Sequence, residues 1–388
     1  MNRKGSKKIL FGLLVSVLVV AFFTVSTSAE SSGIKSKQAD STEGGNLETD
    51  FGANFMAEWW YLNGKATLVS SDDEKKDVGF FVVLGHQESP LFRGYSHMLS
   101  FYGIYSSDSE TDFNYIETYV PRTDIDQYIA LHTPYVDYKY PVGLKIMNGS
   151  AVAGYYLKYL SDNKKVDMNL FFQTNVDKTI DRADQPLSFT TYEHSYGTLH
   201  GSILLDGKRY KISRAEGYLD HMIPVSTRPW PMDMHGWSWI EVTTKNYQVV
   251  AYAVRGIGDG YGDYSYKHLT LLNKNNGKVL AEYSGNEIKI IETDWITESK
   301  FNRKRPSEVV FSTPDLIVSV NAESVIDFNR SNPASATGFV DFMAFQQDDA
   351  KIQYTGDKKN NDDDKKDDNT EKGSAFYEYL VSDAGVTK

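Results

Sequence analysis

Residues 201–213 read GSILLDGKRYKIS, in which an apolar run and an alternating run stand on either side of Asp206-Gly207. The dipeptide Asp-Gly is typical of a tight turn between antiparallel strands. In Arg209–Ser213 every second residue is apolar or aromatic, which is the period of a strand with one buried face. The stretch therefore predicts strands joined by a tight turn.

Similar runs recur along the chain from Phe51 onwards, and turn signals such as Asn148-Gly149 and Asn276-Gly277 separate many of them. No helical periodicity extends beyond two turns. Strands at this spacing predict an all-β protein, a sandwich or a barrel. The other strand-like runs are Gly79–Gly85, Ser96–Ser106, Tyr115–Val120, Lys165–Thr174, Gly236–Thr243, Gln248–Arg255, His268–Leu272, Lys278–Tyr283, Glu287–Thr293, Glu308–Ser312, Leu316–Val320, Thr337–Gln346 and Ala375–Val381.

Composition limits the function classes. The net charge of −11 argues against a nucleic-acid partner, because phosphate binding needs clustered cations. The chain has no cysteine, which excludes disulfides and thiolate metal sites. Hydrophobic residues make up 40% of the chain and permit a packed core, and an aromatic share of 13% favours strands.

The N-terminus has the layout of a secretory signal. Four cations in 1–8 precede the apolar run Ile9–Val25, and Thr27-Ser28-Ala29 offers small residues for cleavage before Glu30. The apolar run is long for a signal, so residues 1–29 are either a cleaved signal peptide or a membrane anchor. In both cases we expect an extracytoplasmic protein, secreted or associated with a membrane surface through this segment. Residues 30–49 are polar and predict a flexible leader.

The remaining residues, about 340, are too many for one small barrel, so we expect two β-domains, 50–228 and 229–388. The second domain contains a low-complexity charged insertion, 357–372, which predicts a solvated loop. A calcium loop fits this insertion poorly, because the Asp spacing and the required glycine do not match.

Residues 217–242, GYLDHMIPVSTRPWPMDMHGWSWIEV, concentrate polar groups among aromatics. Asp220, His221, Asp233 and His235 suit acid–base chemistry, a metal site or the polar rim of an apolar pocket. No pair of histidines has a metal-binding helical spacing, so we expect no metal. Because no phosphate-binding loop, dinucleotide fingerprint or nucleophile elbow is present, we expect no cofactor.

The heptapeptide EWWYLNG, 58–64, holds two adjacent tryptophans. On a strand, Trp59 and Trp60 point to opposite faces, so one enters the core and the other faces a partner sheet or a cavity. A purely structural interpretation, in which large aromatics plug the end of a barrel, competes with a role in binding.

In order and spacing, three motifs resemble the carotenoid 1,2-hydratase (hydroxyneurosporene synthase) family and its AttH-like relatives. They are EWWYLNG with the later Gly85-His86-Gln87 and Ser96-His97, then Glu216–His221, and then Trp237-Ser238-Trp239. The resemblance implies two lipocalin-like antiparallel β-domains packed side by side. It also implies a lipophilic small molecule as partner, and alkene hydration, isomerisation or cyclisation as activity.

Carried over by position, the resemblance assigns Asp220, His221 and Tyr252 to the catalytic site. Two positions depart from the hydratase pattern: Ile223 stands where a tryptophan is expected, and Val254 where an acid is expected. These departures leave the chemistry open. Asp220 and His221 have a structural, a catalytic or a metal-binding role, in that order of preference.

We expect an aromatic pocket near the junction of the two domains, because pockets form preferentially at such junctions and at barrel mouths. Its expected lining is Trp59, Trp60, Tyr61, His97, Trp237 and Trp239, with Asp220, His221 and Tyr252 as polar groups. Two functions stay open: an enzyme acting on an isoprenoid-like molecule, and a non-catalytic binder of a lipophile or of a cell-envelope component. A buried carboxyl with a raised pKa in the cavity would favour the enzyme.

Overall fold

The structure, a computed structural model, describes residues 57–88, 94–106, 112–132, 135–150, 153–179, 189–224, 234–330, 338–356 and 370–382. All of them belong to one compact unit, Ala39–Lys388. The expected signal or anchor, the leader, the segment 229–231, Asp233 and residues 357–369 of the charged insertion lie outside the described residues. No helix among the residues described is long and apolar enough to cross a membrane.

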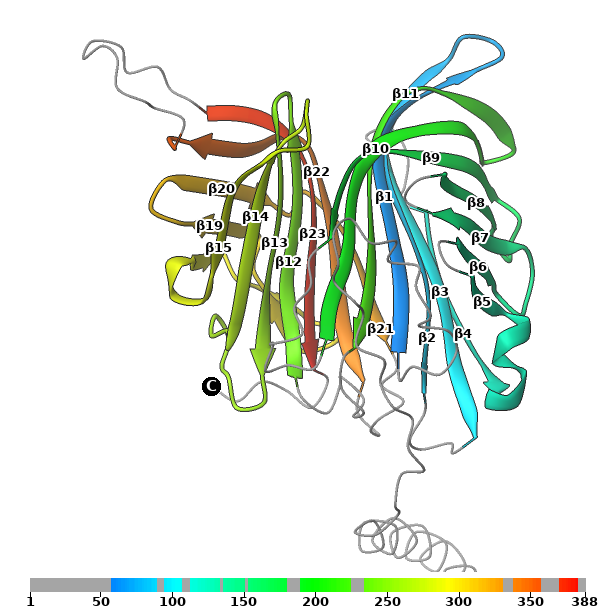
Figure 1. Ribbon diagram of the computed structural model, residues 1–388, viewed down its shortest axis with the longest axis horizontal. Helices are drawn as coiled ribbons and strands as arrows, with labels where there is room; N and C mark the ends of the chain where they lie inside the picture. Colours follow the sequence, from blue (N-terminus) through cyan, green and yellow to red (C-terminus); the bar gives the residue numbers. More distant parts are fainter. Residues whose placement is uncertain are drawn as a thin grey trace, which may run out of the picture. The chain divides into compact units, whose positions relative to one another are not determined.

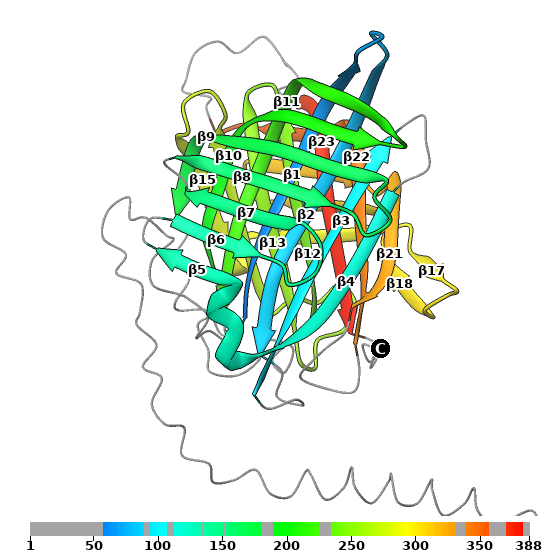
Figure 2. The same ribbon diagram turned by 90° about the vertical axis from the view of Figure 1, so that its right-hand side faces the viewer.

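The first sheet is an antiparallel array of eleven strands. In spatial order they are β4 (Asp112–Pro121), β3 (Tyr95–Ser106), β2 (Lys75–Glu88), β1 (Ala57–Ser70), β11 (Lys208–Pro224), β10 (Phe189–Leu205), β9 (Val166–Thr179), β8 (Gly154–Leu160), β7 (Lys145–Ser150), β6 (Tyr135–Lys139) and β5 (Ile129–His132). A short 3₁₀ helix, η1 (Arg122–Gln127), joins β4 to β5. Figure 2 shows β5–β9 crossing in front of β1–β4, so the sheet curls over itself as a half-barrel.

The second sheet has ten strands. In spatial order they are β15 (Val279–Ser284), β14 (Tyr266–Asn273), β13 (Tyr247–Gly256), β12 (Met234–Thr244), β23 (Thr370–Ser382), β22 (Phe339–Tyr354), β20 (Leu316–Asn321), β19 (Glu308–Ser312) and β16 (Lys289–Thr293), and β21 (Ser324–Arg330) also pairs with β22. A small hairpin, β17 (Ile296–Glu298) and β18 (Arg303–Arg305), and the 3₁₀ turn η3 (Gly285–Glu287) complete this half.

The protein has three apolar layers, one inside each half-barrel and one between them. One layer fills the interior of the first sheet around Trp60, Phe80 and Tyr102, and another fills the interior of the second around Ile240, Phe311 and Phe342. The third lies where β1–β3 and β11 face β12, β13, β22 and β23, and Figure 1 shows these strands side by side at the centre. The junction is therefore itself a hydrophobic core.

Hydrogen bonds cross the same junction. The Tyr105 hydroxyl donates to the Met343 carbonyl over 2.8 Å, and Lys65 Nζ donates to the Gln347 carbonyl over 2.8 Å. At another point Lys274 Nζ lies 2.9 Å from Glu216 Oε1. Hydrophobic contacts and hydrogen bonds therefore both connect the two sheets.

The sequence predicted the fold class correctly, and the lipocalin-like arrangement of two antiparallel sheets is confirmed. Gly201–Ser213 is indeed a turn between strands, β10 and β11, with positive φ at Asp206 and Gly207. Several strands were not expected, namely β5 to β8, β17, β18 and β21. Residues 370–372, assigned to the solvated insertion, instead begin β23, which pairs with β22.

Gly236 occupies a position in β12 that only glycine suits. Its φ is +137°, and a Cβ at this residue would lie 1.8 Å from the carbonyl oxygen of Leu380 on β23. Neither backbone can withdraw without breaking the pairing of Trp237 with Leu380. The glycine therefore lets β12 bring its two tryptophans close to β23.

We expect Gly236→Ala to lower the free energy of unfolding by about 1–3 kcal/mol more than Gly207→Ala does. Gly207 also has a positive φ, +80°, but a Cβ there would meet nothing within 4 Å. The difference between the two variants therefore reports the Leu380 clash together with the less favourable φ of Gly236. Urea unfolding of both variants measures the difference, and equal losses would contradict the role given to the Leu380 contact.

Candidate functional site

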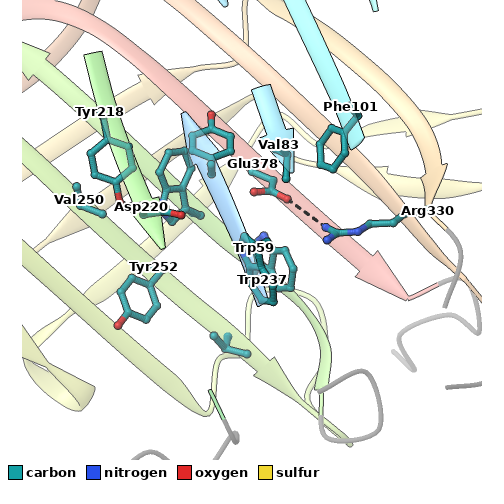
Figure 3. A pocket seen from close by; sticks show the side chains of 13 residues that line it. Trp59, Val83, Phe101, Tyr218, Asp220, Trp237, Val250, Tyr252, Arg330 and Glu378 are labelled. Atoms are coloured by element: carbon teal, nitrogen blue, oxygen red, sulfur yellow. Dashed lines mark hydrogen bonds and ion pairs between the residues drawn. The ribbon is translucent and has the colours of Figure 1, made fainter. Parts of the chain in front are cut away.

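A pocket of about 680 Å³, including its open mouth, lies in the central apolar layer. Both half-barrels contribute to its wall (Figure 3). The first sheet supplies Trp59, Tyr61, Val83, Phe101, Tyr218 and Asp220, and the second supplies Trp237, Trp239, Val250, Tyr252, Val254, Arg330 and Glu378.

Aromatic rings form most of this wall. Tyr61 meets Trp239 edge to face with the ring centroids 5.1 Å apart, and Tyr218 lies 5.8 Å from the same indole. Edge and face contacts of this kind fix ring orientations and bury large apolar areas. The result is a rigid, electron-rich surface suited to an apolar or unsaturated molecule.

Asp220 is one of two carboxyl groups in the pocket, and it enters from β11. Its side chain is buried, and the Tyr218 hydroxyl donates a hydrogen bond to Asp220 Oδ2 over 3.0 Å. Burial and the neighbouring Asp220 charge raise the pKa of Tyr218 well above its usual range, so this hydroxyl stays protonated and remains a donor. A hydrogen bond donated to a carboxylate favours the ionised form of that carboxylate.

Glu378 is the second carboxyl group, and it enters from β23 on the opposite side of the pocket (Figure 3). Arg330 Nη1, on β21, lies 4.0 Å from Glu378 Oε1 and 3.6 Å from Asp341 Oδ2. Asp341, on β22, is fully buried, whereas 12% of the Glu378 side chain is exposed. Two carboxyl groups thus share one guanidinium.

The two acids have displaced pKa values. Burial raises the pKa of Asp341 well above its usual range, the Glu378 charge adds to this, and Arg330 opposes it. Burial likewise raises the pKa of Glu378, while Arg330, the Trp237 indole and Asp341 act in the opposite direction. A carboxyl pair with only one neighbouring cation in a poorly solvated place is most stable with one proton bound.

Six of the nine residues expected at the site line this pocket: Trp59, Tyr61, Asp220, Trp237, Trp239 and Tyr252. The structure places Trp60 and His221 elsewhere, on the inner face of the first half-barrel. There their rings stack with centroids 4.6 Å apart. Because Asp220 and His221 are neighbours on β11, their side chains point to opposite faces of the sheet and do not act as one pair.

His97 also lies outside the pocket. Its Nε2 is 3.0 Å from Glu117 Oε2, and its ring stacks on Tyr119. His221 shares the first half-barrel with His86, and burial lowers the pKa of His221 to about 3 and that of His86 to about 4. These two imidazoles are neutral at physiological pH and supply no acid. Among the described residues, no group of His, Asp or Glu side chains could hold a metal ion.

Sequence reasoning missed Glu378, Arg330 and Asp341. A signal for the two acids was present, because each stands on a strand face that is otherwise apolar. Asp341 alternates with Phe339 and Met343, and Glu378 alternates with Phe376 and Leu380. A charged residue at a position where the period requires an apolar one indicates a buried functional or structural charge. Arg330 had no such signal, since β21 itself was not predicted.

The sequence matches no known family profile and no curated protein. Solved structures do match over 84% of the chain. One is a protein assigned as AttH from Nitrosomonas europaea, with a TM-score of 0.58, 14% identity and 92% of that protein covered. This chain shares the fold of that protein. Kievitone hydratase from Nectria haematococca matches with a TM-score of 0.51 and 9% identity, and 88% of that protein is covered. CghA in complex with Sch210972 matches with a TM-score of 0.52 and 9% identity, and 89% of that protein is covered.

A further buried acid, Glu241, lies on β12 outside the pocket. Thr243 donates to Glu241 Oε1 over 2.5 Å, and Gln248 donates over 3.4 Å. Burial raises the pKa of Glu241 from 4.5 to about 7, against these two hydrogen bonds. The protonated form is therefore favoured by folding, and its contribution is complete below pH 4.5 and lost as the pH rises through 7.

We expect Glu241→Gln to become more stable than the wild type as the pH rises. The amide keeps the shape without a charge, so the stability difference between variant and wild type should grow by roughly 3 kcal/mol from acidic to mildly alkaline pH. Urea unfolding of both proteins across this range measures it. A difference that does not change with pH would contradict the burial of a titrating carboxyl.

Proposed function

We propose that the protein binds an apolar, unsaturated small molecule between its two half-barrels and changes it by acid–base chemistry. One observation carries this proposal: an aromatic pocket contains carboxyl groups from opposite sides, Asp220 and Glu378. Burying charge in an apolar layer is costly, so acids retained there indicate a chemical role. The raised pKa of Glu378 supports an enzyme in particular.

Alkene chemistry fits the lining. Protonation of an electron-rich double bond creates a cation, which aromatic faces stabilise by cation–π attraction. Water then adds, or a neighbouring proton leaves, or the chain cyclises. We propose hydration, isomerisation or cyclisation of an isoprenoid-like substrate. Two structural neighbours are consistent with this: one is named a hydratase, and the other holds a small molecule.

A second candidate is a non-catalytic lipophile or cell-envelope binder. The position of Arg330, 4.0 Å from Glu378, favours it, because a cation at this distance stabilises an ionised carboxylate. An ionised Glu378 has no proton to donate, so it would serve only as a polar group that orients the bound molecule. For either function we propose an extracytoplasmic location, from the apolar N-terminal segment Ile9–Val25.

The pocket itself is tested by filling it. Val254→Phe adds a ring at a buried lining residue and should weaken binding of the neutral dye N-phenylnaphthylamine at least about tenfold. Val142→Phe is the matched control, because Val142 is exposed and lies outside the pocket. Dye fluorescence titration measures both. If both variants bind as the wild type does, the dye binds elsewhere and this pocket is not the site.

Catalysis is tested with lipophiles from the organism that makes the protein. Lipophiles extracted from the source envelope are incubated with the wild type, then compared with untreated extract by mass spectrometry. A component that gains the mass of water, or that changes its retention at constant mass, supports the enzyme. Components that bind but remain unchanged support the binder.

A further inference from the structure

The acid cluster on β21, β22 and β23 has an order in depth. Glu378 and Arg330 line the pocket, whereas Asp341 is completely buried and does not line it. In the pairing of β22 with β23, Met343 is opposite Glu378 and Asp341 is opposite Leu380, so the two acids are diagonal neighbours on one face. A substrate therefore meets Glu378 and not Asp341.

Resting on the function proposed above, we propose that Glu378 is the proton donor to the bound molecule and that Asp220 is the base on the opposite wall. Asp341 is then a positioning residue, which keeps one proton on the pair, and Arg330 holds the carboxylate that forms when Glu378 gives up its proton. The sequence resemblance assigned Asp220, His221 and Tyr252 to the catalytic site, and of these the proposal keeps Asp220 alone.

Local charges explain why this cluster holds a proton. The ionisable groups that face Glu378 are Arg330 from β21, Asp341 from β22, and Tyr61 and Tyr105 from β1 and β3. Both tyrosines have pKa values raised well above the usual range by burial, so they are neutral. One guanidinium therefore faces two carboxyl groups, and one proton makes the cluster neutral.

Asp220, on the facing wall, has a hydroxyl donor as its neighbour. The Tyr218 hydroxyl donates to it, as a group that activates or orients a base would. A carboxylate that accepts such a hydrogen bond is stabilised in its ionised form. Opposite walls of the pocket thus hold a proton donor and a proton acceptor, which is the arrangement that acid–base catalysis requires.

The proposed reaction is the addition of water to an alkene. The Glu378 carboxyl transfers its proton to one alkene carbon, and the π electrons form the new C–H bond, leaving a cation on the other carbon. A water oxygen bonds to this cation, and Asp220 accepts a proton from that water. Asp220 then returns a proton to solvent and Glu378 regains one, so the sum is alkene plus water giving alcohol.

The experiment uses the full chain and farnesol, an apolar alcohol with trisubstituted double bonds, in D₂O. Reversible deuteron transfer from Glu378, with loss of a proton from the same carbon, replaces hydrogen by deuterium in the alkene. Completed hydration instead adds the mass of D₂O, as one C–D bond and one OD group, so mass spectrometry separates the two steps. Glu378→Gln should lower both signals at least about 100-fold. Asp220→Asn should retain deuterium incorporation and lose the hydrated product.

Glu241→Gln is the matched control, since it removes another buried acid from the same sheet but outside the pocket. It should react as the wild type does. Retained binding of N-phenylnaphthylamine by Glu378→Gln shows that this variant is folded. Wild-type activity in Glu378→Gln together with loss of both signals in Asp220→Asn would overturn the assignment but keep the proposed function.

Two further outcomes are separable. If farnesol binds the wild type but gains no deuterium, Glu378 is not a donor and the protein is a binder. If neither farnesol nor the dye binds, the proposed function itself is wrong. The part given to Asp341 has its own readout, the infrared carbonyl stretch of a protonated carboxyl group. Measured in the Glu241→Gln background at neutral pH, this band should disappear in Asp341→Asn and return in Asp341→Glu.

Discussion

Side-chain alternation on strands that are buried on both faces is the constraint on which this structure depends. β1, β11, β12 and β23 each have one face toward the interior of their own half-barrel and one toward the junction. Adjacent residues therefore enter different compartments. Trp59 reaches the pocket while Trp60 packs inside the first half-barrel, and Asp220 and His221 separate in the same way.

This division also explains how charge is tolerated in the centre of the protein. Each half-barrel has its own interior core, so the junction need not supply all of the stability. A buried carboxyl pair beside one arginine contributes little to stability and can reduce it. The two interior cores offset this cost. On the facing sheet, the Tyr218–Asp220 hydrogen bond is a second polar contact in this layer.

The fold class followed from the sequence because turn dipeptides and period-two alternation are local signals, as in 201–213. The aromatic half of the pocket followed as well, through Trp59, Tyr61, Trp237 and Trp239. The choice between faces did not, because knowing that Trp59 and Trp60 diverge does not reveal which face is the junction. The Arg330–Asp341–Glu378 cluster depends on the pairing of β21 and β23 with β22. This pairing brings Arg330 and Glu378, which are 48 residues apart in the chain, to 4.0 Å from each other. No local sequence pattern encodes such a pairing.

Because the walls of the pocket come from two separate sheets, a bound molecule would contact both of them. Any molecule that touches Trp59 and Trp237 at once bridges the half-barrels, and its binding free energy adds to that of their docking. Saturation of the site would therefore suppress transient separation of the sheets before it affected either interior core. Hydrogen exchange at β1 and β12 would report occupancy even for a ligand that is never chemically changed.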